Sequence, residues 1–183
     1  MKNLRALIIL LTFLTTFLLP SPASAQNSAE AFMSATFGLS SKRTQLRMER
    51  SGAEASDFIR DGRLSMKGLF EGRPALFIFG FHPKKGLNYK AVYLTSTGNS
   101  QKDYEFYENL RLAYTLRFGT VKERPLPNMR VEGKLMYRSV WTPNKYTTIA
   151  LSYDPKATNR FPGESPGARP IHLIYSYSKW DKK

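Results

Sequence analysis

The feature that most constrains this fold is an unbroken apolar run, residues 75–81, enclosed by two short turns. The run is apolar on both faces, which is typical of a central β-strand. The turns at 71–74 and 83–86 combine glycine, proline and charged residues. Because turns of this length join only antiparallel neighbours, residues 62–95 are predicted to form a three-stranded antiparallel meander.

The strongest helical pattern follows this meander, over residues 101–118, and Gly119 comes directly after it. Its apolar residues recur at spacings of three and four, the period of one helix face: Tyr104, Tyr107, Leu110, Tyr114 and Phe118. A second helix is predicted over 41–50, because Ser40 is a good N-cap and Gly52 a natural stop.

Strand patterns return at 135–141, 146–153 and 171–180. The order is therefore helix, three strands, helix, three strands, which predicts an α+β fold. We expect an antiparallel sheet of about six strands with two helices packed on one face. Residues 37–183 are predicted to form a single domain. The similar order of its halves is consistent with two internal repeats, 37–95 and 100–180.

The N-terminus predicts export. Two positive charges precede an apolar run at 6–19, and Ala23 and Ala25 give the small-x-small pattern of a cleavage site. The run is shorter than the roughly 20 residues of a spanning helix. We expect a signal peptide at 1–25, cut after Ala25, and a flexible segment at 26–36 that could include a short helix. The expected location is the periplasm, with secretion beyond the outer membrane as the alternative.

The charge balance points to anionic partners. The formal net charge is +14, and it falls to +12 once Lys2 and Arg5 leave with the signal peptide. Such a domain is attracted to anionic polymers, lipid surfaces and acidic envelope proteins. The chain has no cysteine, so it has neither disulfides nor thiolate chemistry. The partner's identity and the oligomeric state stay open.

The segment LNYKAVY at 87–93, followed by a helix that ends in Arg117-Phe118-Gly119, is similar to uncharacterised exported bacterial α+β proteins built from helix-plus-β-meander repeats. The layout resembles units of β-lactamase-inhibitor proteins and of the small lipoprotein of the outer-membrane barrel-assembly machinery. The chain departs from both, because it has no lipid-attachment cysteine and no disulfides. The resemblance spans residues 37–178 and rests on layout, so it transfers no functional residue.

Catalytic and metal chemistry has little support. The only histidines, His82 and His172, are far apart in sequence, so we predict no zinc site and no cofactor. Residues 163–167 match G-x-S-x-G, but Pro166 lacks the N–H that an oxyanion hole needs there. We therefore expect no enzyme. An envelope hydrolase whose carboxylates converge only in the fold is the alternative.

Binding is the predicted function, through one of two surfaces. The first consists of basic turns, at Lys84 with Lys85, at 122–130 and at Arg138 with Lys145, together with the outer face of the sheet. That face is expected to mix cations with aromatic rings: Lys67, Lys90 and Arg138 among Tyr89, Tyr93 and Tyr137. The alternative is that the tyrosines pack under the helices and the lysines are ordinary surface residues.

The second predicted surface is the long polar loop 154–170, where Arg160, Phe161 and Arg169 could anchor a partner. The sequence thus predicts a non-enzymatic binding or accessory domain. A protein inhibitor that plugs a partner enzyme with this loop is a further alternative.

Overall fold

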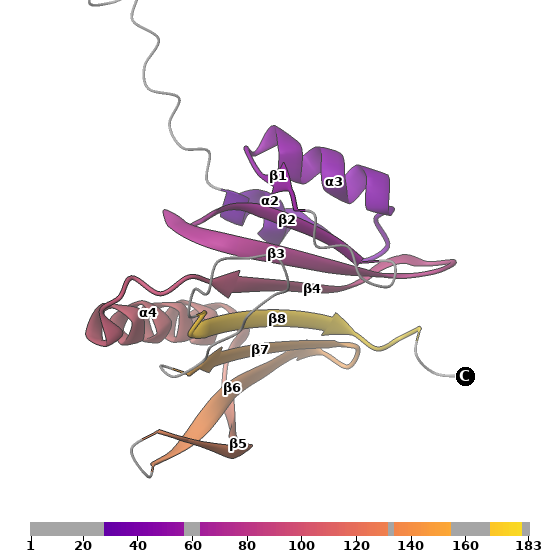
Figure 1. The fold of residues 1–183 in the computed structure, drawn as a ribbon. Helices are drawn as coiled ribbons and strands as arrows, with labels where there is room; N and C mark the ends of the chain where they lie inside the picture. Colours follow the sequence, from indigo (N-terminus) through magenta and orange to yellow (C-terminus); the bar gives the residue numbers. More distant parts are fainter. Residues whose placement is uncertain (1–27, 57–62, 132–133, 155–168, 181–183) are drawn as a thin grey trace, which may run out of the picture.

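The computed structural model describes residues 28–56, 63–131, 134–154 and 169–180, with only the backbone described between 123 and 137 (Figure 1). The predicted signal peptide and most of the loop 154–170 lie outside the described residues. Within the described part, no helix is long and apolar enough to span a membrane.

The described residues form three helices and one antiparallel sheet of eight strands in the order β1-β2-β3-β4-β8-β7-β6-β5. The helices are α2 (Ser28–Ser34), α3 (Ser41–Arg50) and α4 (Ser100–Phe118). The strands are β1 (Glu54–Ala55), β2 (Arg63–Phe70), β3 (Arg73–His82), β4 (Gly86–Leu94), β5 (Lys122–Val131), β6 (Lys134–Asn144), β7 (Thr147–Tyr153) and β8 (Ile171–Tyr177). The α+β class and the antiparallel sheet are confirmed.

The sheet has two strands more than the predicted six. β1 is only two residues long, and β5 covers the stretch that was predicted to be a basic turn. The prolines at 125 and 127 argue against a central strand. They are compatible with β5 because this strand lies at the edge of the sheet, where one side of the backbone needs no partner.

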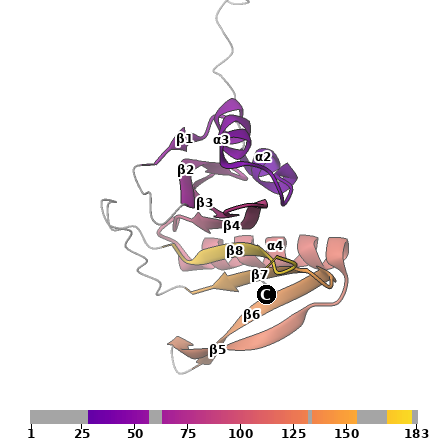
Figure 2. The ribbon, with the colours of Figure 1, turned by 90° about the vertical axis from the view of Figure 1, so that its right-hand side faces the viewer.

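Residues 28–34 form α2, so this part of the segment predicted to be flexible belongs to the core. Phe32 is fully buried, and its ring lies 5.5 Å from that of Phe77 and 5.8 Å from that of Tyr175. Tyr114 of α4 reaches the same Tyr175, at 6.3 Å. The helices α2 and α4 therefore pack on the same face of the sheet. Figure 2 shows α2 and α3 near the β1–β2 edge and α4 at the level of β8 and β7.

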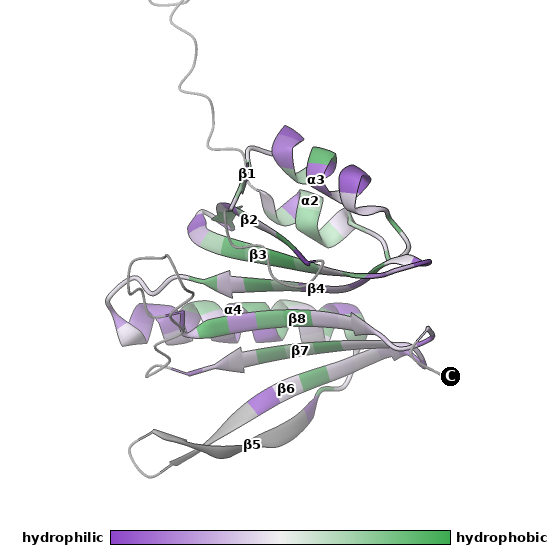
Figure 3. Ribbon diagram, turned by 45° about the vertical axis from the view of Figure 1, so that its right-hand side comes forward, coloured by the Kyte–Doolittle hydropathy of each residue, from purple (hydrophilic) through white to green (hydrophobic). Residues whose placement is uncertain are grey.

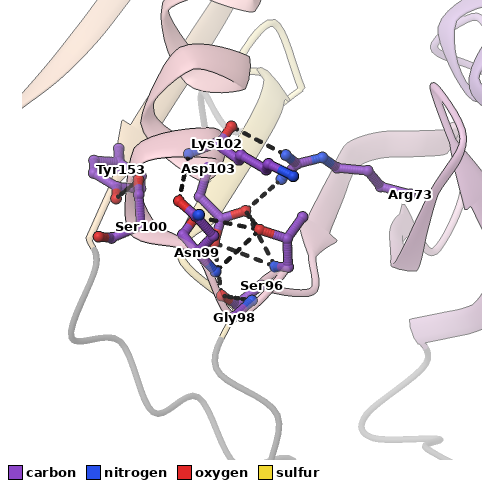
Figure 4. Close-up of polar contacts among 9 residues, drawn as sticks. Arg73, Ser96, Gly98, Asn99, Ser100, Lys102, Asp103 and Tyr153 are labelled. Carbon is purple, nitrogen blue, oxygen red and sulfur yellow. Dashed lines mark hydrogen bonds and ion pairs between the residues drawn. The ribbon is translucent and has the colours of Figure 1, made fainter.

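The start of α4 is fixed by the buried Asp103 (Figure 4). Its carboxylate accepts hydrogen bonds from Ser96 Oγ (2.6 Å), Thr97 Oγ1 (2.9 Å) and Arg73 Nη1 (2.8 Å), while the Asn99 side chain caps the helix. Burial alone would raise the pKa of Asp103, but these hydrogen bonds outweigh it and the pKa lies below its ordinary value. This carboxylate thus ties β3, the β4–α4 loop and α4 together.

Candidate anion-binding surface

Three chain segments with lysines meet at one end of the sheet: the β3–β4 turn, the β6–β7 turn and the residues that follow β8 (Figure 1). We call this the turn-end surface and define it by six residues: Lys84, Lys85, Lys145, Tyr146, Lys179 and Trp180. Its four lysines are all exposed. The segments 82–86, 144–147 and 177–180 contain no acidic residue; in the sequence Asp181 follows them, directly before Lys182 and Lys183. This end of the sheet is therefore locally cationic.

The β6–β7 turn and the end of the chain are joined through Tyr146. The side chain of Asn144 accepts hydrogen bonds from the backbone N–H groups of Tyr146 (2.9 Å) and Thr147 (3.0 Å), which closes the turn. The N–H of Ser178 donates to the carbonyl of Tyr146 (3.0 Å), which brings the residues after β8 against this turn.

Two ammonium groups consequently lie over one ring. The Nζ of Lys145 is 4.9 Å from the centroid of the Tyr146 ring, and the Nζ of Lys179 is 5.5 Å from it. Both distances are within the range of a cation–π interaction. Both positive charges are thus held near the same ring although 34 positions separate the two lysines in the sequence.

A series of contacts between aromatic rings connects the Lys145–Lys179 pair to the β3–β4 turn. The rings of Tyr146 and Tyr177 are 6.0 Å apart, those of Tyr177 and Trp180 are 4.8 Å apart, and Trp180 meets His82 at 6.2 Å. His82 organises the β3–β4 turn, because its Nδ1 accepts from the N–H of Lys84 (3.2 Å). The ring contacts therefore link all three segments.

The structure places Lys90 elsewhere, and its expected place on an exposed basic surface is wrong. Lys90 is 4% exposed, on the helix side of β4. Its Nζ donates to the carbonyls of Phe32 (2.7 Å), Met33 (3.0 Å) and Ala35 (2.9 Å) at the end of α2. Burial, helped by the charges of two arginines, lowers its pKa to about 7. Lys90 therefore anchors a helix end and is not available to a ligand.

Four other predicted residues gather on the face of the sheet opposite the helices. Tyr89 hydrogen-bonds Tyr93, and burial is the main cause of its raised pKa. Tyr93 lies beside His172, with ring centroids 4.8 Å apart. Arg169 donates to the carbonyl of Tyr93 (3.3 Å), and the charge of Arg138 acts on both Tyr89 and His172.

On this second face, burial lowers the pKa of His172, whose Nε2 lies 2.7 Å from the carbonyl oxygen of Arg169. The predicted mixture of cations and tyrosines is thus partly present. Its members are half-buried, however, whereas the lysines of the turn-end surface are exposed. Arg160, Phe161 and the Tyr137 side chain lie outside the described residues.

The helix side also carries an apolar hollow of about 390 Å³ between α2 and α4, lined among others by Met33, Phe106 and Leu110. Its one charged lining residue is acidic, Glu71, so it does not fit an anion. Within the described residues, no three histidine or acidic side chains are close enough together to hold a metal ion.

Sequence reasoning identified Lys84, Lys85 and Lys145 as members of basic turns, and the structure brings these turns together. The sequence-based prediction did not include Tyr146, Lys179 and Trp180 as partners of those lysines. The available signal was the Ser-Lys-Trp that directly follows an aromatic strand end. Comparisons of the chain with protein-family models, with curated proteins and with solved structures find no match.

Proposed function

We propose that this protein is a non-enzymatic binding domain whose ligand is an anionic polymer, held at the turn-end surface. The observation that carries the proposal is the convergence of Lys145 and Lys179 on the ring of Tyr146. Because the ring positions both ammonium groups in advance, less side-chain freedom is lost when an anion binds.

We also propose that the chain is exported, with cleavage after Ala25, so that the mature +12 domain meets anionic polymers in the periplasm or beyond the outer membrane. The charge pattern at 1–5 and the apolar run at 6–19 support this. Mass spectrometry of the protein from a secreting host tests it, since cleavage predicts an N-terminus at Gln26.

Binding is tested by fluorescence anisotropy with a labelled heparin fragment at several salt concentrations. Four lysine contacts predict that the logarithm of the affinity falls with the logarithm of salt concentration with a slope of about −3. The variant Lys145→Gln/Lys179→Gln should flatten the slope by about 1.5. The matched control Lys67→Gln/Lys102→Gln removes two exposed charges elsewhere and should leave the slope unchanged.

The role of the ring is tested separately. Tyr146→Leu should weaken binding roughly two- to fivefold, because the two lysine side chains are no longer ordered before binding and their ordering then costs about 0.5–1 kcal/mol. Tyr146→Phe keeps the ring and should bind as the wild type does. Binding that is indifferent to salt between 0.05 and 0.5 M, or equal for both lysine double variants, would rule out the proposed function.

A further inference from the structure

A second basic surface lies on α3. This helix begins at the N-cap Ser40, whose side chain accepts from the N–H of Arg43, and it buries Thr44 and Met48 against the protein. A different stripe of α3 is exposed, with residues at the spacing i, i+3, i+4 and i+7: Arg43, Leu46, Arg47 and Arg50. Figure 3 shows α3 as mainly hydrophilic, with one clearly apolar segment. Three guanidinium groups therefore project from one side of the helix.

This stripe borders a groove of about 510 Å³, which Leu39 completes. The guanidinium of Arg47 is oriented by α2, because its Nη1 donates to the carbonyl (2.9 Å) and the Oγ (3.0 Å) of Ser34. The one acid of the helix, Glu49, accepts instead from Gln45 (2.7 Å). Among the ion pairs of the described residues, none involves an arginine of this groove. The groove is therefore cationic.

The groove adjoins the turn-end surface. The N–H of Gly38 donates to the carbonyl of Leu87 (2.9 Å), and the N–H of Leu87 donates to the carbonyl of Leu39 (2.8 Å). These bonds hold Leu39, which lines the groove, against the start of β4, next to the turn that carries Lys84 and Lys85. The two cationic surfaces thus meet at this point of the fold.

We propose that one chain of an acidic polysaccharide occupies the turn-end surface and the α3 groove together; this inference rests on the proposed function. Arginine forks suit carboxylate and sulfate groups, which they can bind with two parallel hydrogen bonds. Arg43 and Arg50 are seven residues apart, about 10 Å along the helix. A ligand that continues from there to the lysine turns must be several sugar units long.

The groove favours a polysaccharide over a single-stranded nucleic acid. Nucleic acids of this kind are held by aromatic rings on which bases stack. The apolar residues of the α3 groove are leucines, and two ammonium groups already lie over the Tyr146 ring. Trp180 of the turn-end surface is half-buried and packs against Tyr177 and His82. The described contacts thus offer anion recognition without a stacking platform along the groove.

The test uses heparin-derived oligosaccharides of four and twelve sugar units and a dT12 oligonucleotide. The wild-type protein should bind the twelve-unit chain at least tenfold more tightly than the four-unit chain, and more tightly than dT12. Arg43→Gln/Arg50→Gln should lose most of the extra affinity for the twelve-unit chain. For that chain the slope of the logarithm of affinity against the logarithm of salt concentration should become shallower by about 1.5. This variant keeps Arg47, and so keeps the contact with Ser34 that helps to hold α2. Thermal unfolding checks that the variant is folded.

The outcomes separate the two proposals. If Arg43→Gln/Arg50→Gln retains the full gain with length, the α3 groove is not used and the inference is overturned, while binding at the lysine turns can stand. If dT12 binds as tightly as the twelve-unit sugar, the assignment to polysaccharide is overturned. If Lys145→Gln/Lys179→Gln binds the four-unit chain as the control Lys67→Gln/Lys102→Gln does, the proposed function itself fails.

Discussion

Lys90 should make the stability of this domain depend on pH in a range where ordinary lysines do not titrate. Its pKa is about 7 in the folded protein, against 10.5 for a free lysine. Between these two values the folded protein has released a proton that the unfolded chain still holds, so the free energy of unfolding rises with pH. Below about pH 7 both states hold the proton, and the cost of burying the charge is present in full.

The free energy of unfolding should rise by roughly 2 kcal/mol between pH 7 and pH 9 because of Lys90. That is a sizeable part of the 5–15 kcal/mol typical of a folded domain. The interval stops at pH 9 because burial raises the pKa values of Tyr114 and Tyr175 above 10. These tyrosines lower the free energy of unfolding only near pH 10 and above, where the unfolded chain begins to ionise them.

Urea unfolding at pH 7, 8 and 9, followed by tryptophan fluorescence, measures this effect. The wild-type protein should gain roughly 2 kcal/mol across the interval. Lys90→Met removes the titrating group and should show no such gain, whereas Lys67→Met, at an exposed lysine of β2, should behave as the wild type does. A flat wild-type profile, or an equal rise in Lys90→Met, would refute the reasoning.

Three further predictions concern the fold. Gly86→Ala should destabilise the protein by more than Gly98→Ala, as measured by the urea midpoint: both glycines have positive φ, but only at Gly86 would a Cβ lie 2.5 Å from the carbonyl oxygen of Gly38. Asp103→Asn leaves the Arg73 charge without its carboxylate and should lower the free energy of unfolding by about 3–5 kcal/mol at pH 7. Because the pKa of Asp103 is lowered in the folded protein, the difference between wild type and variant should shrink in acid titrations as pH falls below about 4. Phe32→Ala should cost about 3–5 kcal/mol in urea unfolding, since the ring is fully buried; a loss below 1 kcal/mol would mean that α2 is not part of the core.

Local sequence patterns predicted those elements well that depend on a short turn or on a regular spacing of apolar residues. The meander at 62–95 corresponds to β2, β3 and β4, and the helix at 101–118 corresponds to α4. The helix period was less informative about burial. Tyr107 and Tyr114 are buried as predicted, whereas Tyr104 is 46% exposed. Leu112 and Leu116 are exposed as well, so α4 is apolar on more than one side and its pattern does not define a single buried face.

Strand alternation contained the information that would have placed Lys90 correctly. In β4, Lys90 shares its parity with Val92 and Leu94, which are fully buried on the helix side, and differs in parity from Tyr89 and Tyr93. The sequence prediction grouped Lys90 with these tyrosines by chemistry alone. Alternation does not explain why a lysine is tolerated at this buried position. The reason is that its ammonium group donates to carbonyls at the end of a seven-residue helix more than 50 positions away.

The turn-end surface depends on one long-range pairing that no local pattern contains. β4 and β8 are antiparallel neighbours, with Tyr89 opposite Ser176 and Leu94 opposite Ile171. This orientation sends the end of β8, with Lys179, toward the β3–β4 turn. A parallel pairing would carry Lys179 to the other end of the sheet, beside the end of β4. The lysines themselves are visible in the sequence. Their proximity depends on the pairing of β4 with β8, which joins residues about 80 positions apart. The residue pattern of a single strand does not indicate which other strand will pair with it.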